Sequence, residues 1–107
     1  MKAPIFVAAA ACLLVAGTAF ASQDLFNKNN CALCHKPTPD EKGMGPSLKD
    51  IAAKYKDDAD GAKKIQEAIK NGSKGAWGEN SMMVPQAAVS DDDAKAIATW
   101  IKSLAGE

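Results

Sequence analysis

The stretch "NNCALCHKP", residues Asn29 to Pro37, places two cysteines and the chain's only histidine within five consecutive positions. Two sulfurs and an imidazole this close together suit three kinds of chemistry: a dithiol redox pair, part of a zinc site, or the attachment point of a covalent haem. The motif is short enough to arise by chance, so the rest of the chain has to discriminate between these possibilities.

Residues 1–21, "MKAPIFVAAAACLLVAGTAFA", have the pattern of a cleaved secretory signal peptide. Lys2 supplies the positive start, Ile5 to Ala16 form the apolar middle, and residues 19–21 make a small-x-small cleavage site. We predict cleavage after Ala21 and export of the remaining chain from the cytoplasm.

Two other uses of this N-terminal segment agree less well with its residues. A membrane anchor would need about 20 apolar residues, whereas this run has about 16. A lipid anchor on Cys12 would normally be preceded by a leucine, and here alanines precede it. We expect the mature chain, residues 22–107, to be one small exported domain without stable membrane insertion.

Composition narrows the function classes further. The chain has 13 lysines, no arginine and 13 acidic residues, and loss of Lys2 leaves a net charge of −1. Nucleic-acid-binding proteins usually show a basic excess, and a phosphate-clamping enzyme usually relies on arginine, so both are disfavoured. The mature chain of 86 residues is marginal without a disulfide, a metal or another group in its core.

The spacing of apolar residues predicts helices joined by loops, and no strand. A first helix is expected over residues 22–30 with Leu25 and Phe26 facing inward, and its continuation carries the CALCH motif. A second helix is predicted from four residues spaced at i, i+3, i+4 and i+7, namely Leu48, Ile51, Ala52 and Tyr55. A third is predicted over residues 61–70, burying Ile65, Ala68 and Ile69.

The last helix has the clearest start. Ser90 can cap it, Asp93 follows in capping-box position, and the run Asp91 to Asp93 suits the positive N-terminal end of a helix. This acidic run therefore has a structural explanation and does not require a metal. The apolar stripe that follows, Ile97, Trp100, Ile101 and Leu104, is expected to cross the first helix.

The segment "GAWGENSMMVPQAAV", residues 75–89, has neither helical nor strand periodicity. Loops of this length are uncommon in small domains and are usually functional.

Covalent haem explains the cysteine and histidine motif best. Thiol oxidoreductases place their Cys-x-x-Cys motif after a strand of a βαβ unit, and structural zinc needs four ligands where the mature chain offers three cysteine or histidine residues. On a helical turn, Cys31 and Cys34 lie on one face and can each bond one vinyl group of a porphyrin. His35 is then held under the iron as an axial ligand.

The opposite side of the iron needs a second ligand if the haem carries electrons. Methionine is the usual partner in electron-transfer cytochromes c, because its thioether favours ferrous iron and raises the reduction potential. The segment of residues 75–89 offers Met82 and Met83.

Taken together, the chain resembles the short bacterial class I cytochromes c that donate electrons to periplasmic nitrite reductases or terminal oxidases. The similarity covers the mature chain in separate blocks in the right order: "LFNKNNCALCH", "GPSLKDIAAKY", "IKNGSKGAWG", a methionine loop and "VSDDDAKAIATWIKSL". The resemblance implies an all-α class I cytochrome c fold, with four to five helices around one covalently bound haem.

The resemblance also implies roles for particular residues. Cys31 and Cys34 would bind haem c covalently, and His35 would ligate the iron. Pro46 would offer its carbonyl to the imidazole N–H, and Trp77 would lie at the haem edge with its indole N–H available to a propionate. The plain alternatives are a turn former for Pro46 and a core residue for Trp77.

The methionine loop departs from the family pattern. Relatives show Met-Pro-Pro five residues after the tryptophan; Met82 has that distance here, while Met83 has the proline two residues on. "MVPQAAVS" from Met83 also keeps the family's distance to the last helix, so we predict Met83 as the sixth ligand. Met82 would then be a packing or surface residue.

The family likeness implies a monomeric periplasmic one-electron carrier and not an enzyme. Its donor would be a membrane quinol-oxidising complex or another cytochrome, and its acceptor a nitrite reductase or terminal oxidase. The alternative is a haem enzyme or gas-binding sensor in which neither methionine ligates and the sixth position is open.

Overall fold

A computed structural model describes residues 21–106, so the predicted signal peptide lies outside the described residues apart from Ala21. The described chain begins in a helix over residues 21–28. The elements that follow are the 3-10 helix η1 (Cys31–Leu33), the helices α2 (Leu48–Tyr55) and α3 (Gly61–Asn71), the strands β1 (Ser73–Lys74) and β2 (Met82–Met83), the helix α4 (Asp91–Ser103) and the 3-10 helix η2 (Leu104–Gly106). No helix in this part of the chain is both long and apolar enough to cross a bilayer.

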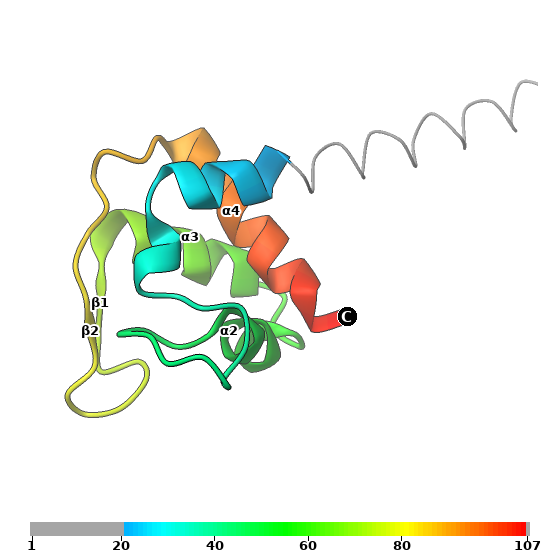
Figure 1. The fold of residues 1–107 in the computed structure, drawn as a ribbon. Helices are drawn as coiled ribbons and strands as arrows, with labels where there is room; N and C mark the ends of the chain where they lie inside the picture. The colour runs from blue at the N-terminus through cyan, green and yellow to red at the C-terminus, as the bar shows by residue number, and fades with distance from the viewer. Residues whose placement is uncertain (1–20, 107) are drawn as a thin grey trace, which may run out of the picture.

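The N-terminal helix lies across α4, as Figure 1 shows, and this crossing was predicted from the sequence. The rings of Phe26 and Trp100 meet there with their centroids 5.5 Å apart and their planes inclined by 59°. Tilted aromatic pairs at this separation are favourable because the edge of one ring faces the negative face of the other. Phe26 is buried, whereas Leu25 is half-buried against the same core.

A single hydrophobic cluster joins the helices. The predicted inward residues of α2 and α3 are buried apart from Tyr55 and Ala68, which are half-buried. On α4, Trp100 is half-buried, while Ala94, Ile97, Ala98 and Ile101 are buried. The helical stripes predicted from the sequence are therefore confirmed, because each helix presents one apolar face to this cluster.

Two serines begin helices by accepting a backbone hydrogen bond. The Ser47 hydroxyl accepts from the Asp50 N–H at 3.1 Å, and the Ser90 hydroxyl accepts from the Asp93 N–H at 3.1 Å. Each bond satisfies one of the N–H groups that a helix leaves unpaired at its start. The predicted capping role of Ser90 is confirmed.

The expectation of a chain without strands is wrong in one place. β1 and β2 form an antiparallel pair in which Ser73 faces Met83 and Lys74 faces Met82. Strands of two residues are too short to leave an alternating pattern in the sequence, which is why periodicity could not reveal them. In Figure 1 the pair closes the base of an extended loop at the edge of the molecule away from the C-terminus.

An exposed ion pair holds the connection between α2 and α3. Lys64 Nζ lies 2.5 Å from a carboxylate oxygen of Asp58, whose other oxygen accepts the Asp60 N–H at 2.9 Å. The hydrogen bond from Lys64 lowers the pKa of Asp58, and the same contact raises the pKa of Lys64.

We expect the contribution of Asp58 to stability to depend on pH. Because its folded-state pKa is lowered, the contribution is present above the ordinary value of 3.8 and is lost as the pH falls through the lower folded-state pKa. Asp58→Asn should therefore unfold more easily than the wild type at about pH 7, and the difference should shrink towards about pH 2. Denaturant unfolding across this range measures it, and Asp57→Asn is the control. A difference that stays constant down to the acid limit would contradict the assignment.

Removal of the α4 cap should weaken the protein. Ser90→Ala leaves the Asp93 N–H without its side-chain acceptor and should lower the free energy of unfolding by about 1 kcal/mol. Ser90→Asn, which can accept the same bond, should stay close to the wild type. Denaturant unfolding of the haem-loaded protein measures both, and equal losses in the two variants would argue against capping.

Candidate haem site

The cysteine motif lies on a tight turn. The first helix ends at residue 28, and Asn30 adopts a left-handed conformation with φ 64° before η1 begins. The prediction that this helix continues through the motif is therefore wrong, because a left-handed residue interrupts a right-handed helix. Asparagine tolerates this conformation better than most residues. The Cys31 carbonyl then accepts the N–H groups of Cys34 at 3.2 Å and His35 at 3.0 Å.

Both cysteines are half-buried free thiols. Cys31 and Ala32 pack against the hydrophobic cluster, whereas Leu33 between the cysteines is 72% exposed. Burial raises the pKa of the Cys31 thiol, and the nearby Cys34 adds to this, while a backbone hydrogen bond acts in the opposite direction. The turn thus sets the Cys31 thiol against the core.

One nitrogen of His35 has a protein partner. Nδ1 lies 2.8 Å from the Pro46 carbonyl oxygen, so a proton on Nδ1 is donated to that oxygen and the lone pair of the imidazole resides on Nε2. The Gly45 N–H also donates to the Cys34 carbonyl at 2.9 Å. The segment before α2 therefore makes two hydrogen bonds to the Cys-x-x-Cys-His motif. Histidines that bind metals are usually held in this way, through a hydrogen bond from the ring nitrogen that does not bind the metal.

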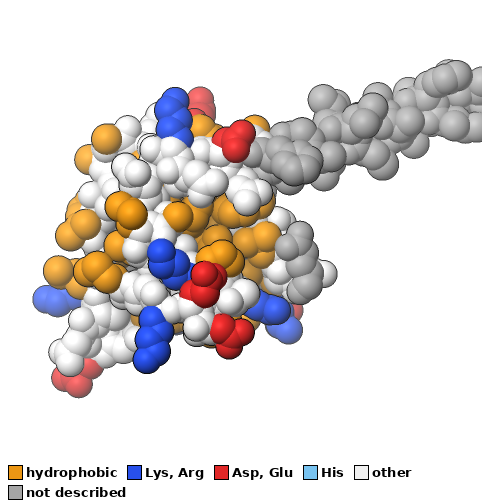
Figure 2. Space-filling model, in the orientation of Figure 1, with side chains coloured by type: hydrophobic (Ala, Val, Ile, Leu, Met, Phe, Trp, Pro, Cys, Tyr) orange, Lys and Arg blue, Asp and Glu red, His pale blue; other side chains and the backbone are white. Residues whose placement is uncertain are grey.

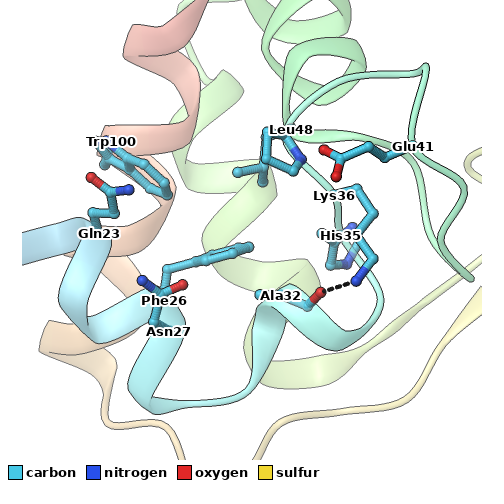
Figure 3. A pocket seen from close by; sticks show the side chains of 10 residues that line it. Gln23, Phe26, Asn27, Ala32, His35, Lys36, Glu41, Leu48 and Trp100 are labelled. Atoms are coloured by element: carbon cyan, nitrogen blue, oxygen red, sulfur yellow. Dashed lines mark hydrogen bonds between the residues drawn. The ribbon is translucent and has the colours of Figure 1, made fainter.

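A cavity of about 260 Å³ borders the imidazole of His35. Figure 3 shows side chains of the N-terminal helix and Trp100 of α4 on one side of it, and the segment around His35 on the other. Its apolar wall includes Phe26, Leu48 and Trp100, and Lys36 reaches back to the Ala32 carbonyl at 3.1 Å. The histidine ring thus faces both an open space and the edge of the core.

The two adjacent methionines point in different directions. Met83 is half-buried and packs against the same hydrophobic cluster as Cys31, whereas Met82 is 71% exposed. Successive residues of a strand point to opposite faces, so β2 can turn only one of the two inward. Met83, which pairs with Ser73, is the one on the inner side.

Trp77 lies in the loop between β1 and β2 and is 37% exposed. Its backbone N–H donates to the Ser81 hydroxyl at 3.0 Å, and that hydroxyl donates to the Gly78 carbonyl at 2.9 Å. From α2, Lys54 Nζ donates to the Ala76 carbonyl at 2.8 Å and lies 4.6 Å from the centroid of the Trp77 ring. A cation over an indole face is attractive, so α2 helps to hold the tryptophan.

Comparison with known proteins places this arrangement in a family. The sequence profile described as Cytochrome c matches residues 21–105. The chain belongs to the cytochrome c family. Cytochrome c-552 of Nitrosomonas europaea is 53% identical over 96 residues, which cover 90% of this chain and 90% of that protein. Cytochrome c-551 of Pseudomonas aeruginosa is 43% identical over 79 residues, covering 74% of this chain and 72% of the relative.

Solved cytochromes c share the fold. The crystal structure of wild-type Nitrosomonas europaea cytochrome c552 matches with a TM-score of 0.71 at 51% identity, covering 77% of this chain and 98% of that one. Class 1 cytochrome MtoD from Sideroxydans lithotrophicus ES-1 matches with a TM-score of 0.60 at 30% identity, covering 78% and 92%. The class I cytochrome c fold predicted from the sequence is confirmed.

Membership of the cytochrome c family establishes the cofactor and the broad activity. The chain is a small electron-transfer cytochrome with a covalently bound c-type haem, and it is not an enzyme. The donor set present fits this group: two free thiols on one turn, a histidine whose Nδ1 is engaged, and a methionine on the inner side of β2.

Sequence reasoning missed the residues that support the site. A Cβ on Gly45 would come within 2.6 Å of His35 Cε1, so only glycine allows the backbone to approach the imidazole this closely. The sequence feature that could have indicated this contact was the glycine before Pro46 in "GMGPS", but a Gly-Pro pair is ordinarily interpreted as a turn. Lys54 left no signal, because an exposed lysine on a helix is ordinarily a solvated residue.

Gly45→Ala should disturb the histidine ring. The added methyl group would displace the imidazole or the backbone, and overpacking of this kind typically costs about 1–3 kcal/mol. We expect a lower free energy of unfolding and an altered haem absorption spectrum in the loaded protein. Gly106→Ala is the control, since a Cβ there would meet nothing within 4 Å. An unchanged spectrum in Gly45→Ala would show that the ring is not held by this contact.

Proposed function

We propose that this chain is a periplasmic one-electron carrier whose haem is attached through Cys31 and Cys34, with His35 and Met83 as the axial ligands. The thioether bonds would form at two thiols that leave the backbone on the same tight turn. The exported location rests on the signal-like pattern of residues 1–21.

The environment of His35 supports its role as a ligand. The Pro46 carbonyl holds the proton on Nδ1, which leaves Nε2 as the atom that can donate electrons to iron. The close packing of Gly45 limits rotation of the ring. His35 would therefore keep the same orientation in both oxidation states, and little would have to rearrange when an electron arrives.

The burial of the adjacent methionines carries the proposal for the second ligand. Among the methionines within residues 21–106, only Met83 packs against the hydrophobic cluster, and Met82 on the other side of β2 is largely in solvent. A thioether ligand favours ferrous iron and raises the reduction potential, which suits a carrier in a respiratory chain. With both axial positions filled by protein, no site is free for a substrate.

The surface around these residues suits brief encounters with other redox proteins. Figure 2 shows hydrophobic side chains gathered over the side of the molecule that carries β1 and β2. Leu33 of the cysteine turn, Met82 and Val84 all remain more than half exposed. We expect small transient interfaces with a membrane quinol-oxidising complex or another cytochrome as donor, and with a nitrite reductase or terminal oxidase as acceptor. The carrier itself would be a monomer.

Replacement of each methionine tests the ligand set. Met83→Ala should abolish the sulfur-to-iron charge-transfer band of the ferric protein, lower the reduction potential and allow the ferrous protein to bind carbon monoxide. Met82→Ala should leave all three close to the wild type, because its side chain is 71% exposed. Absorption spectra in both oxidation states and a redox titration measure these properties.

Two other outcomes would redirect the assignment. Loss of the band in Met82→Ala alone would make Met82 the ligand and require the register of β2 to change. A wild-type ferrous protein that binds carbon monoxide readily would mean an open sixth position, and the chain would then belong with haem enzymes or gas sensors rather than carriers.

A further inference from the structure

The segment that carries Met83 returns to the end of α3. The Gln86 N–H donates to the Ile69 carbonyl at 2.8 Å, and β2 pairs with β1 directly after that helix. Gly72 fits beneath the segment, because a Cβ on it would lie 2.6 Å from the Met83 carbonyl oxygen. Backbone contacts thus tie the methionine segment to α3 after Met83 and to β1 at Met82 and Met83.

One side chain strengthens this attachment. Lys70 Nζ, in the last turn of α3, donates to the Val89 carbonyl and lies 3.5 Å from the Ala87 carbonyl oxygen. It also lies 3.5 Å from a carboxylate oxygen of Asp91 at the start of α4. The ammonium group therefore binds the chain at the point where the methionine segment ends and the next helix begins.

The carbonyl contacts matter more than the ion pair. The Asp91 side chain is 84% exposed, and exposed ion pairs contribute little because water and salt screen them. The Lys70 side chain is only 24% exposed, and Val89 is 4% exposed within the hydrophobic cluster. A charged donor to a backbone carbonyl in such a half-buried place is stronger than a bond between neutral groups.

We propose that Lys70 is a positioning residue that holds the Met83 segment closed over the haem. This inference rests on the proposed axial role of Met83. A lysine at a helix C-terminus is usually explained by its attraction to the helix dipole, but that attraction does not require contact with residues 87–91. By bridging α3 to Val89, Lys70 opposes the outward movement through which Met83 would leave the iron.

Imidazole binding to the ferric protein measures this movement, because imidazole can occupy the sixth position only after the methionine has left it. Lys70→Met should raise the apparent imidazole affinity about tenfold, corresponding to loss of one charge-assisted hydrogen bond. Lys70→Arg, which retains a cationic donor, should stay within about twofold of the wild type. Lys70→Gln is measured beside them as a milder neutral replacement and should lie between Arg and Met.

Two lysines of the same helix provide matched controls. Lys63 is exposed and its side chain makes no hydrogen bond or ion pair within residues 21–106, so Lys63→Met removes a charge without breaking such a contact. Lys64→Met removes a charge and an ion pair, but that pair joins Asp58 at the other end of α3. Both variants should keep the imidazole affinity of the wild type.

The outcomes separate this inference from the proposed function. The proposed ligand stands if the wild type shows the sulfur-to-iron band and Met83→Ala loses it. In that case, an imidazole affinity of Lys70→Met equal to that of the two control variants would overturn only the role of Lys70. If the wild type lacks the band, the proposed ligand is wrong, and the role of Lys70 fails with it. Failure of Lys70→Arg to restore the wild-type affinity would also count against a hydrogen-bonded contact.

Discussion

The packing of α3 against α4 is the contact on which both halves of the site depend. The cluster that joins these helices includes Ile69, Val89 and Ile97, and it receives the cysteine turn through Cys31 and the methionine segment through Met83. Protein interiors are close-packed and transmit small shifts, so a change in this cluster would move both segments. The proposed ligation of one iron from both segments requires a constant separation between them, and a shared core provides that constancy.

Backbone hydrogen bonds fasten each segment to a different helix. The cysteine turn is tied to the start of α2, where the Leu48 N–H donates to the Lys36 carbonyl at 2.8 Å and the Gly45 N–H donates to the Cys34 carbonyl at 2.9 Å. The methionine segment is tied instead to the end of α3. Because these bonds use backbone groups that every residue except proline possesses, they constrain the site without demanding particular side chains, except where a glycine must admit the approaching backbone.

Size explains why a covalent group belongs in this molecule. The predicted mature chain of 86 residues buries a smaller share of its surface than a large domain, and eleven apolar residues are buried within residues 21–106. The half-buried residues packed against that core include Cys31, its neighbour Ala32 and Met83. Haem would cover this apolar rim, while Leu33 of the cysteine turn and Met82 of β2 stay in solvent.

The sequence alone determined the local features of the protein. The spacing of apolar residues predicted α2, α3 and α4, and Ser90 predicted the start of α4. The Cys-x-x-Cys-His motif predicted the cofactor. Each of these features depends on residues within about two helical turns of one another. Only the tertiary structure decided what depends on distant segments. In the folded chain the first helix ends before the cysteine motif, and Ser73 pairs with Met83. Met83 rather than Met82 packs against the core, and Lys70 donates to the Val89 carbonyl. Strand pairs of two residues and single long-range hydrogen bonds leave no periodic pattern, so their partners become known only when the chain is folded.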